Sequence, residues 1–207
     1  MDAKICGIKD FKTLQYILNH KYRPKYIGFI CNYPKSKRHV KLNNLKKLIN
    51  VNKKKTKFVG VLVKPNEKFL EKIKYFKFDY YQLYDVDPIK TKIIKKKYNK
   101  KIITALSIEN KNDVIKYKQY ISISDIILFD SKGYEKSMSF DKSWIKNLKI
   151  SKKKMIAGDI KYNDNLDKFV KITDIIDLSG SLETLDKKDL TKINKFLKNL
   201  KKINDKN

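Results

Sequence analysis

The sequence has few cysteines, few arginines and no long hydrophobic run. Its two cysteines, Cys6 and Cys31, are too few for a disulfide framework. No apolar run approaches the roughly 18 residues that span a bilayer. The N-terminal stretch 1–7 lacks the apolar region of a cleavable signal. We therefore expect a cytoplasmic protein without a membrane partner, and the hydrophobic fraction of 41% is enough for a substantial core.

Lysine dominates the charged residues. The formal net charge is +28, from 50 Lys and Arg against 22 Asp and Glu, but only Arg23 and Arg38 are arginine. Specific nucleic-acid contacts favour the forked guanidinium of arginine, and here the lysines are spread along the chain, as in 53–55, 95–97 and 152–154. We interpret them mainly as solvated helix faces and loops. We do not expect nucleic acid as the partner, whereas an anionic small-molecule substrate would benefit from such a field.

Short apolar segments alternate with amphipathic helical patterns along the whole chain. Each segment has the length and composition of a buried strand, and together they occupy residues 3–6, 26–30, 58–63, 80–83, 102–106, 126–129, 155–157 and 175–178. Apolar residues at helical spacing follow each one. Asp10 is predicted to cap the first helix, and the last helix is predicted from about residue 187 to 203.

Eight strand-then-helix units predict a parallel sheet of the α/β class. No linker or low-complexity tract separates them, so we expect one domain over residues 1–207. Eight such units close into a (β/α)8 TIM barrel, for which this length is near the lower end of the usual range. A doubly wound open sheet is the alternative, but it rarely has eight equal units. The least regular segment is 131–150, where only a short helix around 141–145 is predicted.

Polar and small residues follow several predicted strands, at the end where such barrels carry their active sites. Cys6 follows the first strand, the loop 34–38 the second, and Asp130 the sixth. A carboxylate at the end of a buried strand can equally be a helix cap or a satisfied loop acid. The barrel topology instead places Asp130 at the catalytic rim.

The seventh and eighth strands end in a candidate phosphate site. Gly158 and Gly180 would let backbone N–H groups approach a phosphate, and Ser179 and Ser181 would add hydroxyls. The stretch 182–184 is predicted to form the small extra helix that accompanies many such sites. Two ordinary strand-to-helix turns are the alternative interpretation.

Cys6 and Asp130 need opposite pKa shifts to take part in proton transfer. A cysteine base must be partly ionised, so its pKa must fall from about 8.5; otherwise Cys6 is a small buried apolar residue. Lys4 lies on the same side of the strand and would help. A general acid at Asp130 needs a pKa raised from about 3.9. Nearby Lys132 would lower it, so burial or the substrate must supply the shift.

The motifs together resemble the phosphoribosylanthranilate isomerase family. The resemblance runs from end to end, in order and at compatible spacing. The segments that carry it are Lys4-Ile-Cys-Gly-Ile8, Gly28-Phe29, Pro34-Lys-Ser-Lys-Arg38, Val59-Gly-Val-Leu-Val63, Gln82-Leu83, Leu128-Phe-Asp-Ser131, Phe140-Asp141, Ala157-Gly158 and Asp177-Leu-Ser-Gly-Ser-Leu-Glu183.

The resemblance implies an Amadori rearrangement in tryptophan biosynthesis, with no cofactor and no metal. N-(5-phosphoribosyl)anthranilate would become 1-(2-carboxyphenylamino)-1-deoxyribulose 5-phosphate. By the family's pattern, Asp130 would be the general acid that opens the ribose ring and Cys6 the base that removes the C2 proton. Arg38 would bind the anthranilate carboxylate with its planar fork. The remaining predicted substrate-binding residues lie around the phosphate: Gly158, Asp159, Ser179, Gly180 and Ser181.

The sequence departs from the family pattern at four places. The family's Q-L-H-G-x-E reads Gln82-Leu-Tyr-Asp-Val-Asp87, which puts Tyr84 at the histidine position. The segment 133–139 stands where the family has a glycine-rich stretch. A-G-G becomes 157–159, which puts the carboxylate of Asp159 near the presumed phosphate, and S-S-G becomes 179–181. These changes leave the acid, the base and the carboxylate anchor in place, and they affect the loop after the sixth strand and the phosphate site.

Two other functions are compatible with parts of the sequence. Another phosphate-binding TIM-barrel enzyme, such as an epimerase or a relative of indole-glycerol-phosphate synthase, would not be expected to combine an N-terminal Cys-Gly with P-K-S-x-R. A basic, non-catalytic barrel that binds nucleic acid is suggested by the charge and the missing glycine segment. The sequence does not distinguish a monomer from a homodimer.

Overall fold

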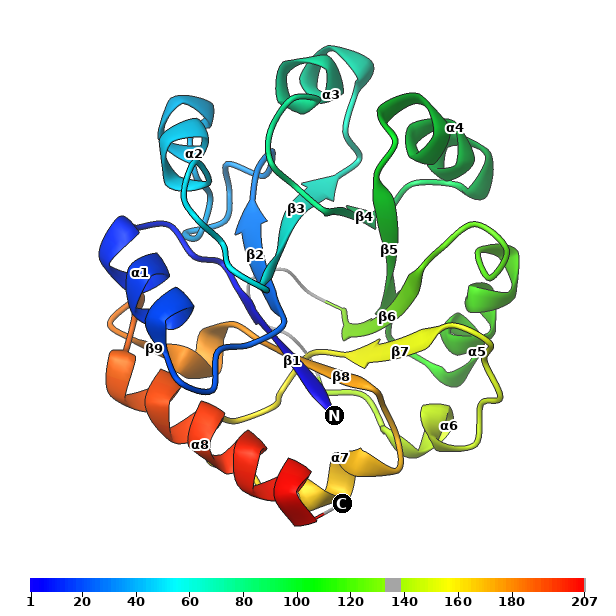
Figure 1. The fold of residues 1–207 in the computed structure, drawn as a ribbon. Helices are drawn as coiled ribbons and strands as arrows, with labels where there is room; N and C mark the ends of the chain where they lie inside the picture. The colour runs from blue at the N-terminus through cyan, green and yellow to red at the C-terminus, as the bar shows by residue number, and fades with distance from the viewer. Residues whose placement is uncertain (133–138, 207) are drawn as a thin grey trace.

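The computed structural model describes residues 1–132 and 139–206 and shows a closed barrel of parallel strands surrounded by helices (Figure 1). Each strand pairs with the next, and β8 pairs with β1 to close the barrel. The strands are β1 (Asp2–Cys6), β2 (Tyr26–Ile30), β3 (Lys57–Val63), β4 (Tyr80–Tyr84), β5 (Lys101–Ile108), β6 (Ile126–Ser131), β7 (Lys153–Ile156) and β8 (Ile175–Leu178). The predicted (β/α)8 TIM barrel is confirmed, and the open sheet is wrong.

A helical segment follows every barrel strand. The segments are α1 (Phe11–Asn19), α2 (Leu42–Leu48), α3 (Glu67–Ile73), α4 (Pro88–Tyr98), α5 (Lys111–Val114) with the 3-10 helix η1 (Ile115–Gln119), α6 (Ser143–Lys146), α7 (Asp167–Val170) and α8 (Leu190–Lys206). Asp10 caps α1 as predicted, because its side chain accepts a 2.8 Å hydrogen bond from the backbone N–H of Thr13. The short α6 lies in the least regular segment, close to where a short helix was predicted.

The segment after β8 differs from the prediction. The small helix predicted at 182–184 lies two residues earlier, as the 3-10 helix η2 (Gly180–Leu182). A hairpin of β9 (Glu183–Thr184) and β10 (Lys187–Lys188) follows it. Leu185 and Asp186 form its turn with φ of +47° and +60°, the left-handed region that tight two-residue hairpin turns use. The last helix is present as predicted, but it begins at Leu190 instead of near residue 187 because the hairpin occupies residues 183–188.

Two apolar layers hold the barrel together. One lies between the strands and the helices, and the other fills the barrel interior with side chains that include Val59, Val61, Ile103, Leu128, Met155 and Ile175. The strands are thus buried on both faces, which is why they read in the sequence as continuous apolar runs. Polar side chains are buried in the barrel as well, among them Gln82 and a fully buried lysine, Lys4. The partner of Lys4 belongs to the site described below.

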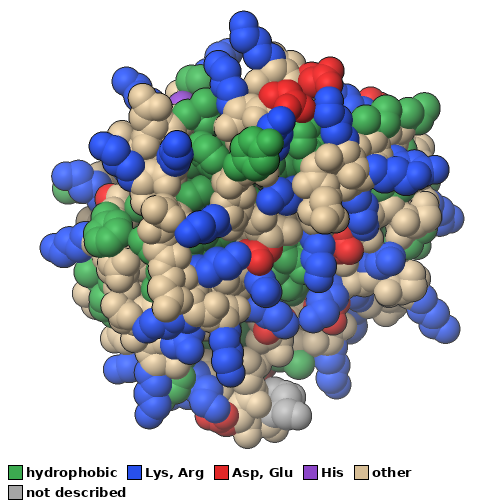
Figure 2. Space-filling view, turned by 45° about the horizontal axis from the view of Figure 1, so that its top comes forward, with side chains coloured by type: hydrophobic (Ala, Val, Ile, Leu, Met, Phe, Trp, Pro, Cys, Tyr) green, Lys and Arg blue, Asp and Glu red, His purple; other side chains and the backbone are tan. Residues whose placement is uncertain are grey.

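Lysine covers the outside of the barrel. Figure 2 shows Lys and Arg side chains over the whole visible face, with a few Asp and Glu between them. On this face they form no single cationic stripe, which agrees with their interpretation as solvated groups. In the described part of the chain, no helix has the length and apolar character needed to cross a membrane. The segment 133–138, where the sequence departs from the family pattern, lies outside the described residues.

Candidate active site

A cavity of about 480 Å³ lies at the C-terminal ends of the barrel strands. It collects side chains from loops that follow strands at opposite sides of the barrel. All eight residues predicted to act on or bind the substrate line it: Cys6, Arg38, Asp130, Gly158, Asp159, Ser179, Gly180 and Ser181. Other polar residues that line it are Tyr33, Ser36, Tyr84, Ser107, Ser131, Lys161 and Asp177.

Asp130 lies near the end of β6 and faces this cavity. Burial raises the pKa of its carboxyl to about 6, and the hydrogen bond from Tyr84 opposes that shift. Tyr84 Oη donates to Asp130 Oδ2 at 2.6 Å. Lys132 was expected to lower the pKa of Asp130. It instead forms an ion pair with Glu109 at the surface. The expected shift is therefore present, and burial supplies it.

Cys6 ends β1 and is 8% exposed. A Cβ placed on Gly28 of the neighbouring β2 would lie 2.8 Å from Cys6 Sγ and 3.2 Å from Lys4 Nζ, so both atoms face the same glycine. Burial raises the pKa of the Cys6 thiol, while the charge of Lys4 and a hydrogen bond from it lower it. Lys4 is therefore the neighbour that the sequence predicts, but the net shift is upward, and Cys6 is a thiol in the resting protein at neutral pH.

Lys4 belongs to a buried ion pair at the floor of the cavity. Its Nζ lies 2.6 Å from Asp177 Oδ2 on β8, with side-chain exposures of 0% and 6%. Burial lowers the pKa of Lys4, but the charge of Asp177 and the hydrogen bonds to Asp177 and Cys6 outweigh it, so the net shift is upward and the lysine is charged. A cation thus lies directly beneath Cys6, where it stabilises a thiolate whenever one forms.

Arg38 is held in place by a carboxylate that the sequence did not identify as its partner. Its Nε and Nη2 donate to the two oxygens of Glu183 at 2.7 and 2.8 Å. Lys188 donates to Glu183 at 2.7 Å and to the backbone oxygen of Ser179 at 2.9 Å. This network fixes the guanidinium plane, and Nη1 makes no hydrogen bond to the described part of the protein. One edge of the fork therefore remains for a ligand carboxylate.

Gly7 is required for this position of Arg38. It has φ of +78°, and a Cβ there would lie 2.6 Å from Arg38 Cδ. Gly7 therefore needs both the left-handed backbone conformation and the absence of a side chain. The Cys-Gly pair of the N-terminal motif places the cysteine and makes room for the arginine at the same time.

The candidate phosphate site lies where β6, β7 and β8 end. Gly158 has φ of +82°, and a Cβ there would lie 1.9 Å from Ser131 Oγ. The hydroxyls of Ser131 and Ser181 are buried and have no hydrogen-bond partner in the described protein. Ser179 differs, because its hydroxyl donates to the backbone oxygen of Cys6 at 3.1 Å. Two uncommitted hydroxyls and an open backbone at Gly158 suit a group rich in acceptor oxygens.

Asp159 lies exposed at the rim of the same cavity, with φ of +50°. Lys161 lines the cavity beside it. A carboxylate disfavours a nearby phosphate, whereas the lysine offsets part of that effect. In the described part of the chain, no group of three or more His, Cys, Asp or Glu side chains could hold a metal ion.

Sequence reasoning missed several polar members of the site. Tyr84, Asp177, Glu183 and Lys188 all contact predicted residues, yet none was assigned a role. The sequence offered one indication for Tyr84, which stands where the family pattern has a histidine. It offered another for Asp177 and Glu183, which are the first and last residues of the last motif. Lys188 had none, because nothing distinguishes it from the other lysines until the hairpin buries it to 2% side-chain exposure.

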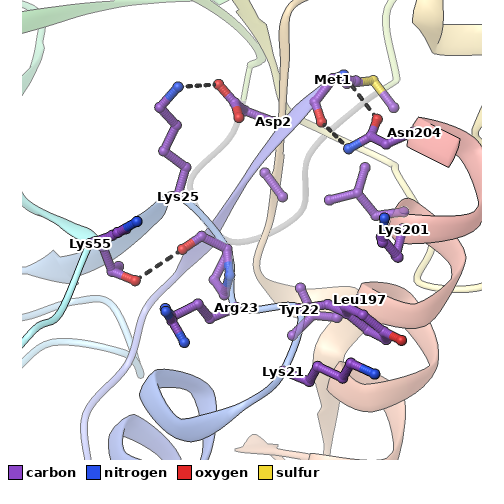
Figure 3. Close-up of a pocket in the computed structure, with 14 residues that line it drawn as sticks. Met1, Asp2, Lys21, Tyr22, Arg23, Lys25, Lys55, Leu197, Lys201 and Asn204 are labelled. Atoms are coloured by element: carbon purple, nitrogen blue, oxygen red, sulfur yellow. Dashed lines mark hydrogen bonds and ion pairs between the residues drawn. The ribbon is translucent and has the colours of Figure 1, made fainter. Parts of the chain in front are cut away.

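A second cavity, of about 500 Å³, lies near the N-terminal ends of β1 and β2, against α8 (Figure 3). Lys and Arg supply five of its 14 lining residues, a larger share than their 50 in 207 for the whole chain. Asp2, its one carboxylate, pairs with Lys25 at 2.7 Å. The lining therefore combines cations with one carboxylate that is already paired, and no acid and base among the described lining residues face each other across it.

The comparisons with known proteins agree over nearly the whole chain. The sequence model of the family described as N-(5'phosphoribosyl)anthranilate (PRA) isomerase matches residues 3–199. The N-(5'-phosphoribosyl)anthranilate isomerase of Clostridium kluyveri is 28% identical, over 97% of this chain and 98% of its own length. That of Rhizobium rhizogenes is 31% identical, over 94% of this chain and 91% of its own length.

Solved structures show the same fold. The phosphoribosyl anthranilate isomerase of Thermotoga maritima covers 98% of this chain and 99% of its own, with 25% identity and a TM-score of 0.83. A phosphoribosyl anthranilate isomerase in complex with reduced 1-(o-carboxyphenylamino)-1-deoxyribulose 5-phosphate has 24% identity and a TM-score of 0.80, over 98% of this chain and 99% of its own.

Proposed function

The chain belongs to the N-(5'-phosphoribosyl)anthranilate isomerase family, and from that premise we propose that Asp130 and Cys6 are its general acid and general base. The protein is an isomerase of tryptophan biosynthesis that acts on a phosphorylated small molecule. The observation that carries the two assignments is their shared cavity, in which a partly protonated carboxyl and a thiol face the same space as Arg38.

The reaction moves hydrogen within the substrate and needs one acid and one base. Asp130 donates its proton to the ribose ring oxygen as the bond from C1 to that oxygen breaks, which leaves a protonated Schiff base between C1 and the anthranilate nitrogen. Cys6, as thiolate, removes the proton from C2, and the resulting enolamine tautomerises to the ketose. A carboxyl with a pKa of about 6 is partly protonated near neutral pH, as this step requires.

Lys4 and Asp177 support the second step. Cys6 must ionise within a buried site, and the charged Lys4 Nζ faces the same glycine as the sulfur. The cation favours the thiolate by direct attraction, while Asp177 at 2.6 Å keeps the lysine charged and fixed. We infer that Lys4 and Asp177 help Cys6 to ionise when it takes the proton from C2, while the resting enzyme keeps Cys6 as a thiol.

Arg38 is proposed to bind the anthranilate carboxylate. Glu183 holds two of its nitrogens and so fixes the plane of the fork, which reduces the entropy lost when a carboxylate binds at the remaining edge. The substrate phosphate is proposed to lie against Gly158 and the hydroxyls of Ser131 and Ser181, which lack protein partners. Gly180 and Ser179 shape this end of the cavity, and Asp159 lies at its rim.

The related complex supports these two placements. Its ligand carries a carboxyphenyl group at one end and a phosphate at the other. Arg38 and the phosphate site lie in one cavity of this chain with Cys6 and Asp130. The family match favours this isomerase over another phosphate-binding barrel and over a non-catalytic one. That the enzyme needs no cofactor, lies in the cytoplasm and does not bind nucleic acid stay predictions.

Loss of phosphoribosylanthranilate fluorescence in the presence of purified protein tests the function. We expect turnover well above background from the wild type, and a fall of about 10²- to 10⁴-fold in Asp130→Asn, the usual contribution of a general acid. Asp125→Asn is the matched control, because Asp125 precedes the same strand and binds Lys95 outside the cavity. An inactive wild type would exclude the isomerase, and equal losses in both variants would exclude a specific role for Asp130.

A further inference from the structure

Tyr84 lies at the end of β4 and hydrogen-bonds in two directions. Its Oη is 2.6 Å from Asp130 Oδ2 and 3.1 Å from Gln82 Nε2. Gln82 is 1% exposed and Tyr84 is 8% exposed. The strand between β4 and β6 carries Ala105 at the position paired with Tyr84. This small side chain leaves room for the tyrosine ring to reach across β5 to the carboxylate.

The two hydrogen bonds have a fixed direction. An ionised carboxylate can only accept, so the single proton of the Tyr84 hydroxyl lies toward Asp130 Oδ2. Gln82 must then present its amide NH2 group, the donor, to the Tyr84 oxygen. Tyr84 accepts from one side and donates on the other, and the order from Gln82 through Tyr84 to Asp130 cannot be reversed while Asp130 is ionised.

We propose that Tyr84, oriented by Gln82, is a positioning residue that reserves Oδ2 of Asp130 as an acceptor and leaves Oδ1 to carry the proton delivered to the substrate. This inference rests on the proposed role of Asp130 as the general acid. The proton leaves Oδ1 for the ribose ring oxygen as the bond from C1 to that oxygen breaks, and the carboxylate that remains keeps its hydrogen bond from Tyr84. Tyr84 itself stays protonated, since burial, followed by the charge of Asp130, holds its pKa well above the ordinary value.

Removing the Tyr84 hydroxyl changes the titration of Asp130 in a known direction. A donor to a carboxylate favours the ionised form, so its loss raises the pKa of Asp130 above about 6. A hydrogen bond to a charged group corresponds to about one to two pH units. Phenylalanine fills the same space as tyrosine apart from one oxygen, so Tyr84→Phe should retain the fold.

Carbon-13 NMR of protein labelled at the aspartate carboxyl carbons measures this shift without substrate. Asp130→Asn identifies the Asp130 signal by its loss. We expect the midpoint to move up by about one to two pH units in Tyr84→Phe. In the control Tyr80→Phe we expect no move, because Tyr80 lies on the same strand but contacts Tyr26. A shift below about 0.3 units in Tyr84→Phe would overturn the proposal.

Kinetics test the consequence for proton delivery. At a pH of about 5, Asp130 is mostly protonated in both proteins, so a difference in kcat/KM there reports delivery and not the protonation state. We expect Tyr84→Phe to lose about 10- to 100-fold at that pH, and Tyr80→Phe less than about twofold. Equal kcat/KM for Tyr84→Phe and the wild type would overturn the proposal. A wild type with no turnover would instead refute Asp130 as the acid, while the NMR shift would still report the orienting hydrogen bond.

Discussion

The pH dependence of kcat/KM follows from the pKa values of Asp130 and Cys6 in the free enzyme. The reactive form has Asp130 protonated and Cys6 ionised. Burial raises the pKa of Asp130 to about 6, and it raises the pKa of Cys6 above its ordinary value. The acid therefore has a lower pKa than the base, and the reactive form is a minority at every pH.

The gap between the two pKa values sets the shape of the profile. Burial raises both pKa values and leaves that of Cys6 well above that of Asp130, so the reactive form is a small minority of the molecules. Below the pKa of Asp130, kcat/KM rises tenfold per pH unit, because the thiolate of Cys6 increases while Asp130 stays protonated. Between the two pKa values the increase in thiolate is cancelled by the ionisation of Asp130. Above the pKa of Cys6, kcat/KM falls.

Initial rates at low substrate from a pH of about 5 to about 10 measure this profile. We expect a break near the Asp130 pKa of about 6, a plateau, and a descent that begins above the ordinary pKa of a cysteine thiol. In Asp130→Asn the residual kcat/KM should keep rising through a pH of about 6 without a break. Asparagine does not ionise, so nothing cancels the increase in Cys6 thiolate. An early break that persists in Asp130→Asn, or a descent that begins well below the ordinary pKa of a cysteine thiol, would refute the reasoning.

Two further substitutions test the carboxylate anchor and the phosphate end of the cavity. Arg38→Lys loses the paired contact to Glu183 and the fork, so kcat/KM should fall about 10- to 100-fold, mostly through a higher KM; an unchanged KM would contradict the anchor role. Gly158→Ala places a Cβ 1.9 Å from Ser131 Oγ at a φ of +82°. We expect the free energy of unfolding to fall by at least about 2 kcal/mol, which lowers Tm by at least about 4 °C. We also expect a raised KM. The control Gly60→Ala, whose Cβ would lie 3.1 Å from a ring outside the cavity, should lower Tm without changing KM.

The sequence predicts the barrel because its strands are buried on both faces. Runs such as 58–63 and 126–129 are apolar throughout, and this pattern is typical of strands in parallel sheets covered by helices. It fails in the hairpin after β8, where Leu185 and Asp186 adopt left-handed conformations. Aspartate tolerates this conformation, but leucine rarely adopts it, so the sequence does not predict the turn. Lysines there continue the helical pattern of α8, and only the burial of Lys188 against Glu183 shows why that segment folds back.

The sequence predicted those site residues that lie at the end of a single strand. It did not predict the contacts between side chains of different strands. Asp130 could be placed at the rim from the order of strands alone. The ion pair of Lys4 with Asp177 joins residues 173 apart in the chain, and it exists because closure of the barrel brings β8 beside β1. The contact of Tyr84 with Asp130 spans 46 residues and depends on the size of the side chain on the strand between them.

The assignment of Cys6 as the base is tested most directly by the turnover of Cys6→Ser against that of Cys31→Ser. Cys31 is also buried, but its thiol donates to the backbone oxygen of Phe29, a bond that a hydroxyl can replace. We predict that Cys6→Ser lowers kcat by about 10²- to 10⁴-fold, because a hydroxyl does not ionise in this pH range. Cys31→Ser should stay within about twofold of the wild type. Turnover of Cys6→Ser equal to that of Cys31→Ser would contradict the account.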